Sequence, residues 1–71
     1  MNVSPAKVEK ILTGHYKFAN LGFALLITSI RSKYLRDSSP VALANFTAEI
    51  NAFIDKNKNS MAQDIKSLGT V

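Results

Sequence analysis

The chain has 71 residues, which is enough for one small domain and leaves no room for a second. Hydrophobic residues make up 46% of it and charged residues 20%, a composition too apolar for an intrinsically disordered segment. The net charge is +4, and the absence of cysteine excludes disulfides and thiolate metal sites. Because a domain this small buries little surface, we expect residues 1–71 to gain stability from self-association or from a partner.

The first expected helix begins at Ser4-Pro5, since serine is a favourable N-cap and proline suits the first helical position. Gly14 can end this helix in the left-handed C-cap conformation. Residues 15–20 are then either a short connection or a bent continuation, and the sequence leaves both open. Apolar residues spaced by three or four indicate one helical face through Val8, Leu12, Tyr16, Ala19, Phe23, Leu26, Ile30 and Tyr34.

The most apolar run extends from Phe18 to Ile30. As a helix it would be about 20 Å long, too short for a hydrocarbon layer of about 30 Å. No small-x-small cleavage site follows it, so we expect neither a transmembrane span nor an export signal. The run therefore predicts a buried helix that ends near Arg36. Leu25 and Ile27 lie off the main apolar face, which implies burial on a second side or a partner surface.

The second half repeats the start signal at Ser39-Pro40 and predicts a helix from Pro40 to about Asn57. Its expected inward face contains Leu43, Phe46, Ile50, Phe53 and Asn57, while Glu49, Asn51 and Asp55 point outward. Ser60 and Gln63 match a capping box that would start a short last helix. Gly69 offers the matching C-cap, and Met61, Ile65 and Leu68 would face inward.

These elements predict an all-α fold, a single helical domain built as a small antiparallel three- to four-helix bundle. The sequence contains one histidine, no cysteine and scattered carboxylates, so no catalytic triad or metal set can be drawn from it. His15 beside Gly14 reads as a loop residue. We therefore expect a protein that is not an enzyme and needs no cofactor, and the lack of cysteine suits a cytoplasmic location.

Positive charge is concentrated in the first half of the chain. Residues 1–36 hold six lysines and arginines against Glu9 alone, a net charge of +5, whereas residues 37–71 have a net charge of −1. Arg31, Lys33 and Arg36, beside Tyr34, form a predicted basic patch. Such a patch could contact phosphates, anionic lipid or an acidic protein face, or could be a solvated helix end.

The stretch from Ser39 to Leu68 resembles the C-terminal half of immunity proteins against pediocin-like bacteriocins, with a Pro-started amphipathic helix, a polar loop and a short last helix. The resemblance implies a cytosolic four-helix bundle that works without chemistry, by docking on the membrane receptor complex used by the toxin and blocking pore formation. It also implies that the third and fourth helices recognise the partner, and the exposed positions it favours are Asn51, Asp55, Lys58 and Lys66.

Two alternatives to a protein-binding module follow from other features. The small core and the apolar positions off the main face suit a self-assembling structural subunit, and "SSPVALANF" with "IKSL" is similar to the needle subunits of type III secretion. The basic first half suits a nucleic-acid or anionic-surface binder. The expected partners are thus a protein, a second copy of the chain or a nucleic acid.

Overall fold

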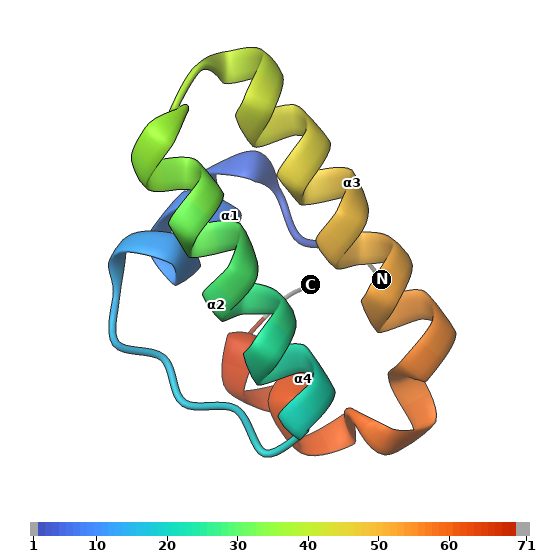
Figure 1. Ribbon diagram of the computed structural model, residues 1–71. Helices are drawn as coiled ribbons and strands as arrows, with labels where there is room; N and C mark the ends of the chain where they lie inside the picture. Colours follow the sequence, from blue (N-terminus) through green and yellow to red (C-terminus); the bar gives the residue numbers. More distant parts are fainter. Residues whose placement is uncertain (1, 70–71) are drawn as a thin grey trace.

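The computed structural model describes residues 2–69, which form four α-helices and one short 3-10 helix (Figure 1). The elements are α1 (Pro5–Thr13), α2 (Leu21–Arg36), α3 (Pro40–Asn57), the 3-10 helix η1 (Lys58–Ser60) and α4 (Ala62–Leu68). No strand occurs within residues 2–69, so the prediction of an all-α fold is confirmed.

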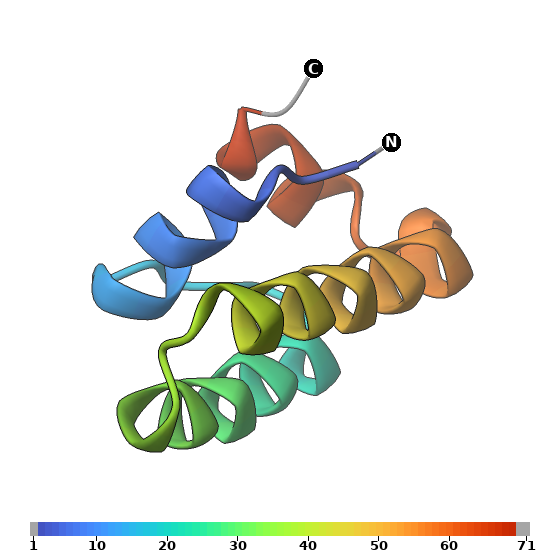
Figure 2. The same ribbon diagram turned by 90° about the horizontal axis from the view of Figure 1, so that it is seen from above.

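The helices are arranged around an antiparallel hairpin. Figure 1 shows α2 and α3 running in opposite directions from the connection 37–39 and separating toward their other ends. The two remaining helices, α1 and α4, lie on the same side of this hairpin (Figure 2). The backbones of α1, α2 and α3 pack closely against one another, whereas α4 reaches the rest of the bundle through its side chains. The fold is therefore a three-helix core with a short fourth helix at the open end of the hairpin.

Local capping signals explain where the first and third helices begin. The Ser4 hydroxyl accepts a hydrogen bond from the backbone N–H of Lys7 at 3.2 Å, and Ser39 accepts one from Ala42 at the same distance. Each serine precedes a proline at the first helical position, as the sequence predicts. The predicted bounds of the third helix, Pro40 to Asn57, are confirmed.

The connection between α1 and α2 settles the alternative that the sequence left open. Residues 14–20 are not helical, so the short connection is right and the continuous face through Tyr16 and Ala19 is wrong. Gly14 ends α1 in an extended conformation (φ −101°, ψ −172°), not the expected left-handed one. Glycine is needed there because a Cβ atom would lie 2.7 Å from the carbonyl oxygen of Lys10.

The hydrophobic core lies between the hairpin and the two helices behind it. On α3 the buried face is rotated from the predicted one, with Ile54 buried and both Leu43 and Phe53 only half-buried. On α2, Ile27 is buried in the same core as Phe23 and Ile30, so its expected burial on a second side is wrong, whereas Leu25 is exposed. The buried apolar residues are Val3, Val8, Ile11, Leu12, Phe23, Ile27, Ile30, Ala42, Phe46, Ile50, Ile54, Met61 and Leu68.

The start of the last helix differs from the prediction. Met61 occupies the N-cap position and makes no side-chain cap, so the Ser60–Gln63 capping box is wrong. Ser60 belongs to η1, and its hydroxyl donates to the carbonyl oxygen of Asn57 at 3.0 Å. The local turn thus competes for the serine hydroxyl and shifts the helix start. The C-cap at Gly69 is confirmed, with φ 61° in the left-handed region.

Hydrogen bonds between distant residues fix the connection 14–20. Asp64 is only 2% exposed, and its two carboxylate oxygens accept the backbone N–H groups of Ala19 at 2.6 Å and Asn20 at 2.9 Å. Asn20 in turn caps α2 by accepting the N–H of Phe23 at 2.9 Å. Because a buried carboxylate needs donors, this contact both satisfies Asp64 and sets the position at which α2 begins.

We predict that Asp64→Asn lowers the free energy of unfolding by about 1–3 kcal/mol, since the amide can accept only one of the two N–H groups and presents a donor to the other. Urea unfolding followed by far-UV circular dichroism measures this change. Asp55→Asn is the matched control, because Asp55 is exposed and should change stability by no more than about 0.5 kcal/mol. Equal stabilities for the two variants would show that the Asp64 contact does not hold the connection.

Candidate functional site

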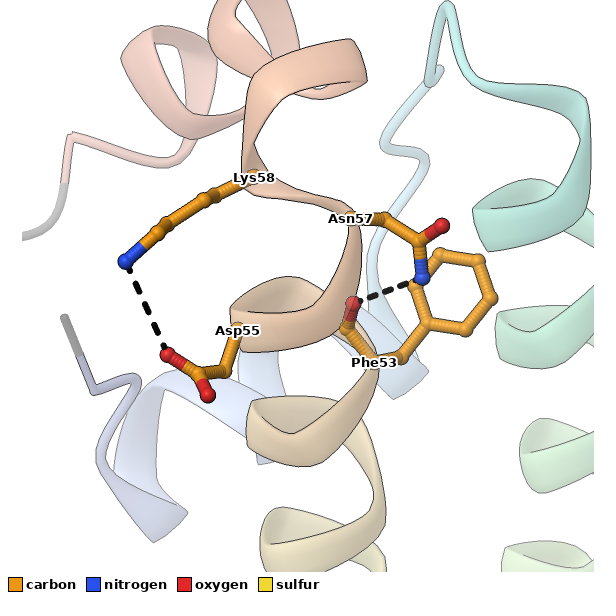
Figure 3. Close-up of polar contacts among 4 residues, drawn as sticks. All are labelled: Phe53, Asp55, Asn57 and Lys58. Atoms are coloured by element: carbon orange, nitrogen blue, oxygen red, sulfur yellow. Dashed lines mark hydrogen bonds and ion pairs between the residues drawn. The ribbon is translucent and has the colours of Figure 1, made fainter.

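The four positions favoured by the resemblance lie on α3, η1 and α4 and differ in exposure. Asp55 and Lys58 are exposed and form a long ion pair at 3.9 Å between Nζ and Oδ1, at the end of α3 (Figure 3). In the same view, Asn57 turns the other way and donates to the carbonyl oxygen of Phe53 at 2.9 Å. Lys66 is exposed on α4. An exposed pair of this kind contributes little to stability, so both side chains can turn to a partner.

Asn51 does not point freely outward as expected. It is half-buried, and its side-chain amide forms two hydrogen bonds with the backbone of Val3, accepting at 2.7 Å and donating at 3.0 Å. The side chain therefore holds the segment before α1 against α3. The prediction that Asn51 is exposed is wrong for this reason.

The predicted basic patch divides into two parts. Arg31 is half-buried, and its Nε donates to the carbonyl oxygen of Leu12 at 3.0 Å while Nη2 donates to that of Ile11 at 3.4 Å. These carbonyl groups belong to the last turn of α1, where a cation also offsets the partial negative charge of the helix end. Lys33 and Arg36 are exposed on the last turn of α2. The surface cluster thus consists of Lys33 and Arg36, with Arg31 committed in part to the fold.

The side of α2 that faces away from the core is unusually apolar. Leu21, Leu25 and Leu35 are 78%, 71% and 82% exposed, and their positions in the sequence place them on one side of the helix. Ser32 shares this side and is small. We call these four residues the outer face of α2. Val41, at the start of α3, adds a fourth large apolar side chain at 73% exposure.

An open groove of about 350 Å³ lies beside the outer face, between α2 and the connection 14–20. One wall carries aromatic rings: Tyr16 and Phe18 stack with centroids 6.1 Å apart, and Phe18 meets the buried Phe23 edge to face at 4.8 Å. The opposite wall is a strip of α2. The lining residues are Tyr16, Lys17, Phe18, Ala24, Ile27, Thr28 and Arg31.

Sequence reasoning missed the groove and most of the outer face. The pattern indicated that α2 has a second apolar side, because Leu25 lies off the main apolar face. It placed Tyr16 in a core stripe and did not single out Leu21 or Leu35 at all. Recognising the groove would have required knowing that residues 14–20 fold back along α2, and no local signal shows this.

Metal ions in proteins are bound by groups of histidine, cysteine or acidic side chains. Within residues 2–69 no cluster of three or more histidine or acidic side chains could hold a metal ion. His15 is exposed in the connection, as expected of a loop residue. No helix in the same range is long and apolar enough to cross a membrane.

One titratable pair joins α1 to α2. The Tyr34 hydroxyl donates a hydrogen bond to Glu9 Oε2 at 2.8 Å. This bond favours the neutral phenol, and together with slight desolvation and the negative charge of Glu9 it raises the pKa of Tyr34 above its usual 10.0. The pair uses Glu9, the one acidic side chain of the first 36 residues, and no lysine or arginine of that half forms an ion pair within residues 2–69.

Comparisons with protein-family models, with curated proteins and with solved structures found no match to this chain.

We predict that Glu9→Gln lowers the pKa of Tyr34, which is measured from the ultraviolet absorbance of the phenolate in a Tyr16→Phe background that leaves one tyrosine. Because the folded-state pKa is raised, the contribution of the pair to stability is present below pH 10.0 and lost as the pH rises through the raised value. Glu49→Gln, on the outer surface of α3, is the control and should leave the titration unchanged. An unchanged titration in Glu9→Gln as well would contradict the pairing.

Proposed function

We propose that this protein is a non-enzymatic, cytoplasmic helical module that binds another protein through the outer face of α2. The observation that supports this proposal is the exposure of Leu21, Leu25 and Leu35 on a single side of one helix. Large apolar side chains that gather on one exposed side mark contact surfaces more often than isolated ones do. The placement of these leucines on one side of the helix suits a partner helix, which packs along such a row of residues.

The charges of α2 favour a partner that carries acidic residues. The helix contains Arg31, Lys33 and Arg36 and no aspartate or glutamate. Two copies of the chain pairing through α2 would bring six like charges to one interface, which opposes association. An amphipathic helix with an apolar stripe flanked by carboxylates would instead bury the leucines and pair with Lys33 and Arg36 at the rim.

Small residues make close approach possible in the middle of this face. Ser32 and Thr28 are exposed and lie between the leucines at either end of the helix. A partner side chain could therefore reach the backbone of α2 there, while the terminal leucines cover the ends of the contact. The expected partner residues are thus large and apolar at the centre of its helix.

The resemblance of residues 39–68 supports a more specific form of the proposal, in which the partner is the membrane receptor complex used by a pediocin-like bacteriocin. In this form Asp55, Lys58 and Lys66, all exposed, extend the recognition surface to α3, η1 and α4. Expression of the chain in sensitive cells, challenged with a panel of pediocin-like peptides, tests this form. Survival of the expressing cells is expected, and killing by every peptide would reject the immunity role without rejecting the binding module.

We predict that a photo-crosslinking amino acid at position 25 captures a partner protein in the cells that make this chain. The matched control is the same amino acid at Ala48, an exposed position on α3. Capture at position 25 should fall by about tenfold or more when Leu21 and Leu35 are both changed to serine, because each buried leucine contributes about 1.5–3 kcal/mol. Lys33→Glu with Arg36→Glu should also reduce it if the partner is acidic.

Other outcomes of this experiment separate the alternatives. Crosslinks at position 25 that join two copies of the chain would identify a self-assembling subunit instead. Equal capture at positions 25 and 48, insensitive to the serine changes, would show that the outer face has no special role and would overturn the proposal.

A further inference from the structure

We propose that the groove between the connection 14–20 and α2 binds a small carboxylate with an apolar body, such as a medium-chain fatty acid or an arylalkanoic acid. This site is distinct from the outer face of α2 and does not depend on the proposed protein partner. Four features of the groove carry the inference: its fixed walls, its unpaired cations, its apolar lining and its size.

The walls of the groove are held in place by contacts with the rest of the fold and by the stacking of two lining rings. At one end the connection is fixed by the two hydrogen bonds from Ala19 and Asn20 to the buried Asp64. In its middle, Tyr16 stacks on Phe18, and Lys7 from α1 lies over the Tyr16 ring with Nζ 5.9 Å from the ring centroid. A ligand that entered the groove would therefore meet a preformed surface and would lose little affinity to ordering the protein.

The groove presents positive charge and no negative charge. Arg31 uses two of its five N–H groups on the carbonyl oxygens of Leu12 and Ile11. The bonds to α1 fix the guanidinium and leave its remaining N–H groups for an anion, since no carboxylate within residues 2–69 forms an ion pair with it. Lys17 is a second lining residue with a cationic side chain. A half-buried guanidinium held in one orientation is a favourable donor for a carboxylate.

The rest of the lining is apolar and suits the body of such a ligand. The rings of Tyr16 and Phe18 form one side, and Ala24 and Ile27 form the other. The volume of about 350 Å³ falls at the lower end of the range typical of small-molecule sites, so the ligand is of modest size. The combination of an apolar cleft with one or two cations favours an amphipathic anion over an inorganic anion or a neutral hydrocarbon.

Thr28 lines the groove and is exposed beside the leucines of the outer face. Its hydroxyl donates to the carbonyl oxygen of Ala24 at 3.0 Å. The hydroxyl oxygen of Thr28 can therefore still accept a hydrogen bond, but the hydroxyl cannot donate a second one. A carboxylate offers only acceptors and would therefore turn away from Thr28 toward the cations. The expected pose places the carboxylate between Arg31 and Lys17, with the apolar body against the two rings.

The test is a titration of the ¹⁵N-labelled protein with octanoate, followed by the amide shifts in two-dimensional NMR spectra. Octanol and octylamine are the matched probes, with the same chain but no negative charge. Saturating shifts are expected at residues 16–18 and 24–31, with a dissociation constant of order 1 mM for a ligand of this size. Octanoate should bind about tenfold more tightly than octanol, and octylamine should not saturate.

Two variants keep the test decisive. Ala24→Trp fills the groove without removing a hydrogen bond and should abolish the octanoate shifts, while Ala48→Trp on the exposed side of α3 should leave them unchanged. Lys17→Gln should weaken octanoate binding several-fold with no effect on octanol. Equal affinities for octanoate and octanol, or persistence of the shifts in Ala24→Trp, would overturn the proposal, and shifts confined to the outer face would identify nonspecific binding to the exposed leucines.

Discussion

The hydrogen bonds between the Asp64 carboxylate and the N–H groups of Ala19 and Asn20 are the constraint on which the rest of the structure depends. A helix as short as α4 has little stability of its own, and its backbone does not pack against the hairpin. The buried carboxylate ties α4 to the start of α2, and Met61 and Leu68 are buried as well. The contact fixes the point where α2 begins and the connection that forms one wall of the groove.

Two other long-range contacts use the same kind of chemistry. Arg31 satisfies carbonyl groups at the end of α1, and Asn51 pairs with both backbone groups of Val3. In each case a polar side chain completes backbone groups that no helix can satisfy. In this small domain without disulfides, side chains from distant helices thus form hydrogen bonds with the backbone groups that the helices leave unpaired. Those side chains are then less available to bind a partner.

The sequence predicts well those features that depend on residues no more than four positions apart in the chain. The starts of α1 and α3 follow from Ser4-Pro5 and Ser39-Pro40, and the end of α4 follows from Gly69, because capping is local. The roles of Arg31, Asn51 and Asp64 were not predictable, since their partners lie 19 to 48 residues away in the chain. The same limit explains the candidate sites: periodicity showed that α2 has two apolar sides, but only the packing of α1 and the connection decides which leucines stay exposed.

The connection 14–20 differs from an ordinary surface loop because its length cannot easily change. Loops usually accept insertions, because their bonds are made between neighbours and can form again in a longer segment. The connection 37–39 is of that kind, since the Asp37 side chain accepts the N–H of Ser39 two residues away. Residues 14–20 instead join two segments that distant side chains hold. Arg31 holds the end of α1, and Asp64 holds Ala19 and Asn20. One added residue would therefore break the contacts of α1 or those of α4. Variation in length among related chains should therefore accumulate at the hairpin tip, while the spacing from Gly14 to Asn20 stays constant.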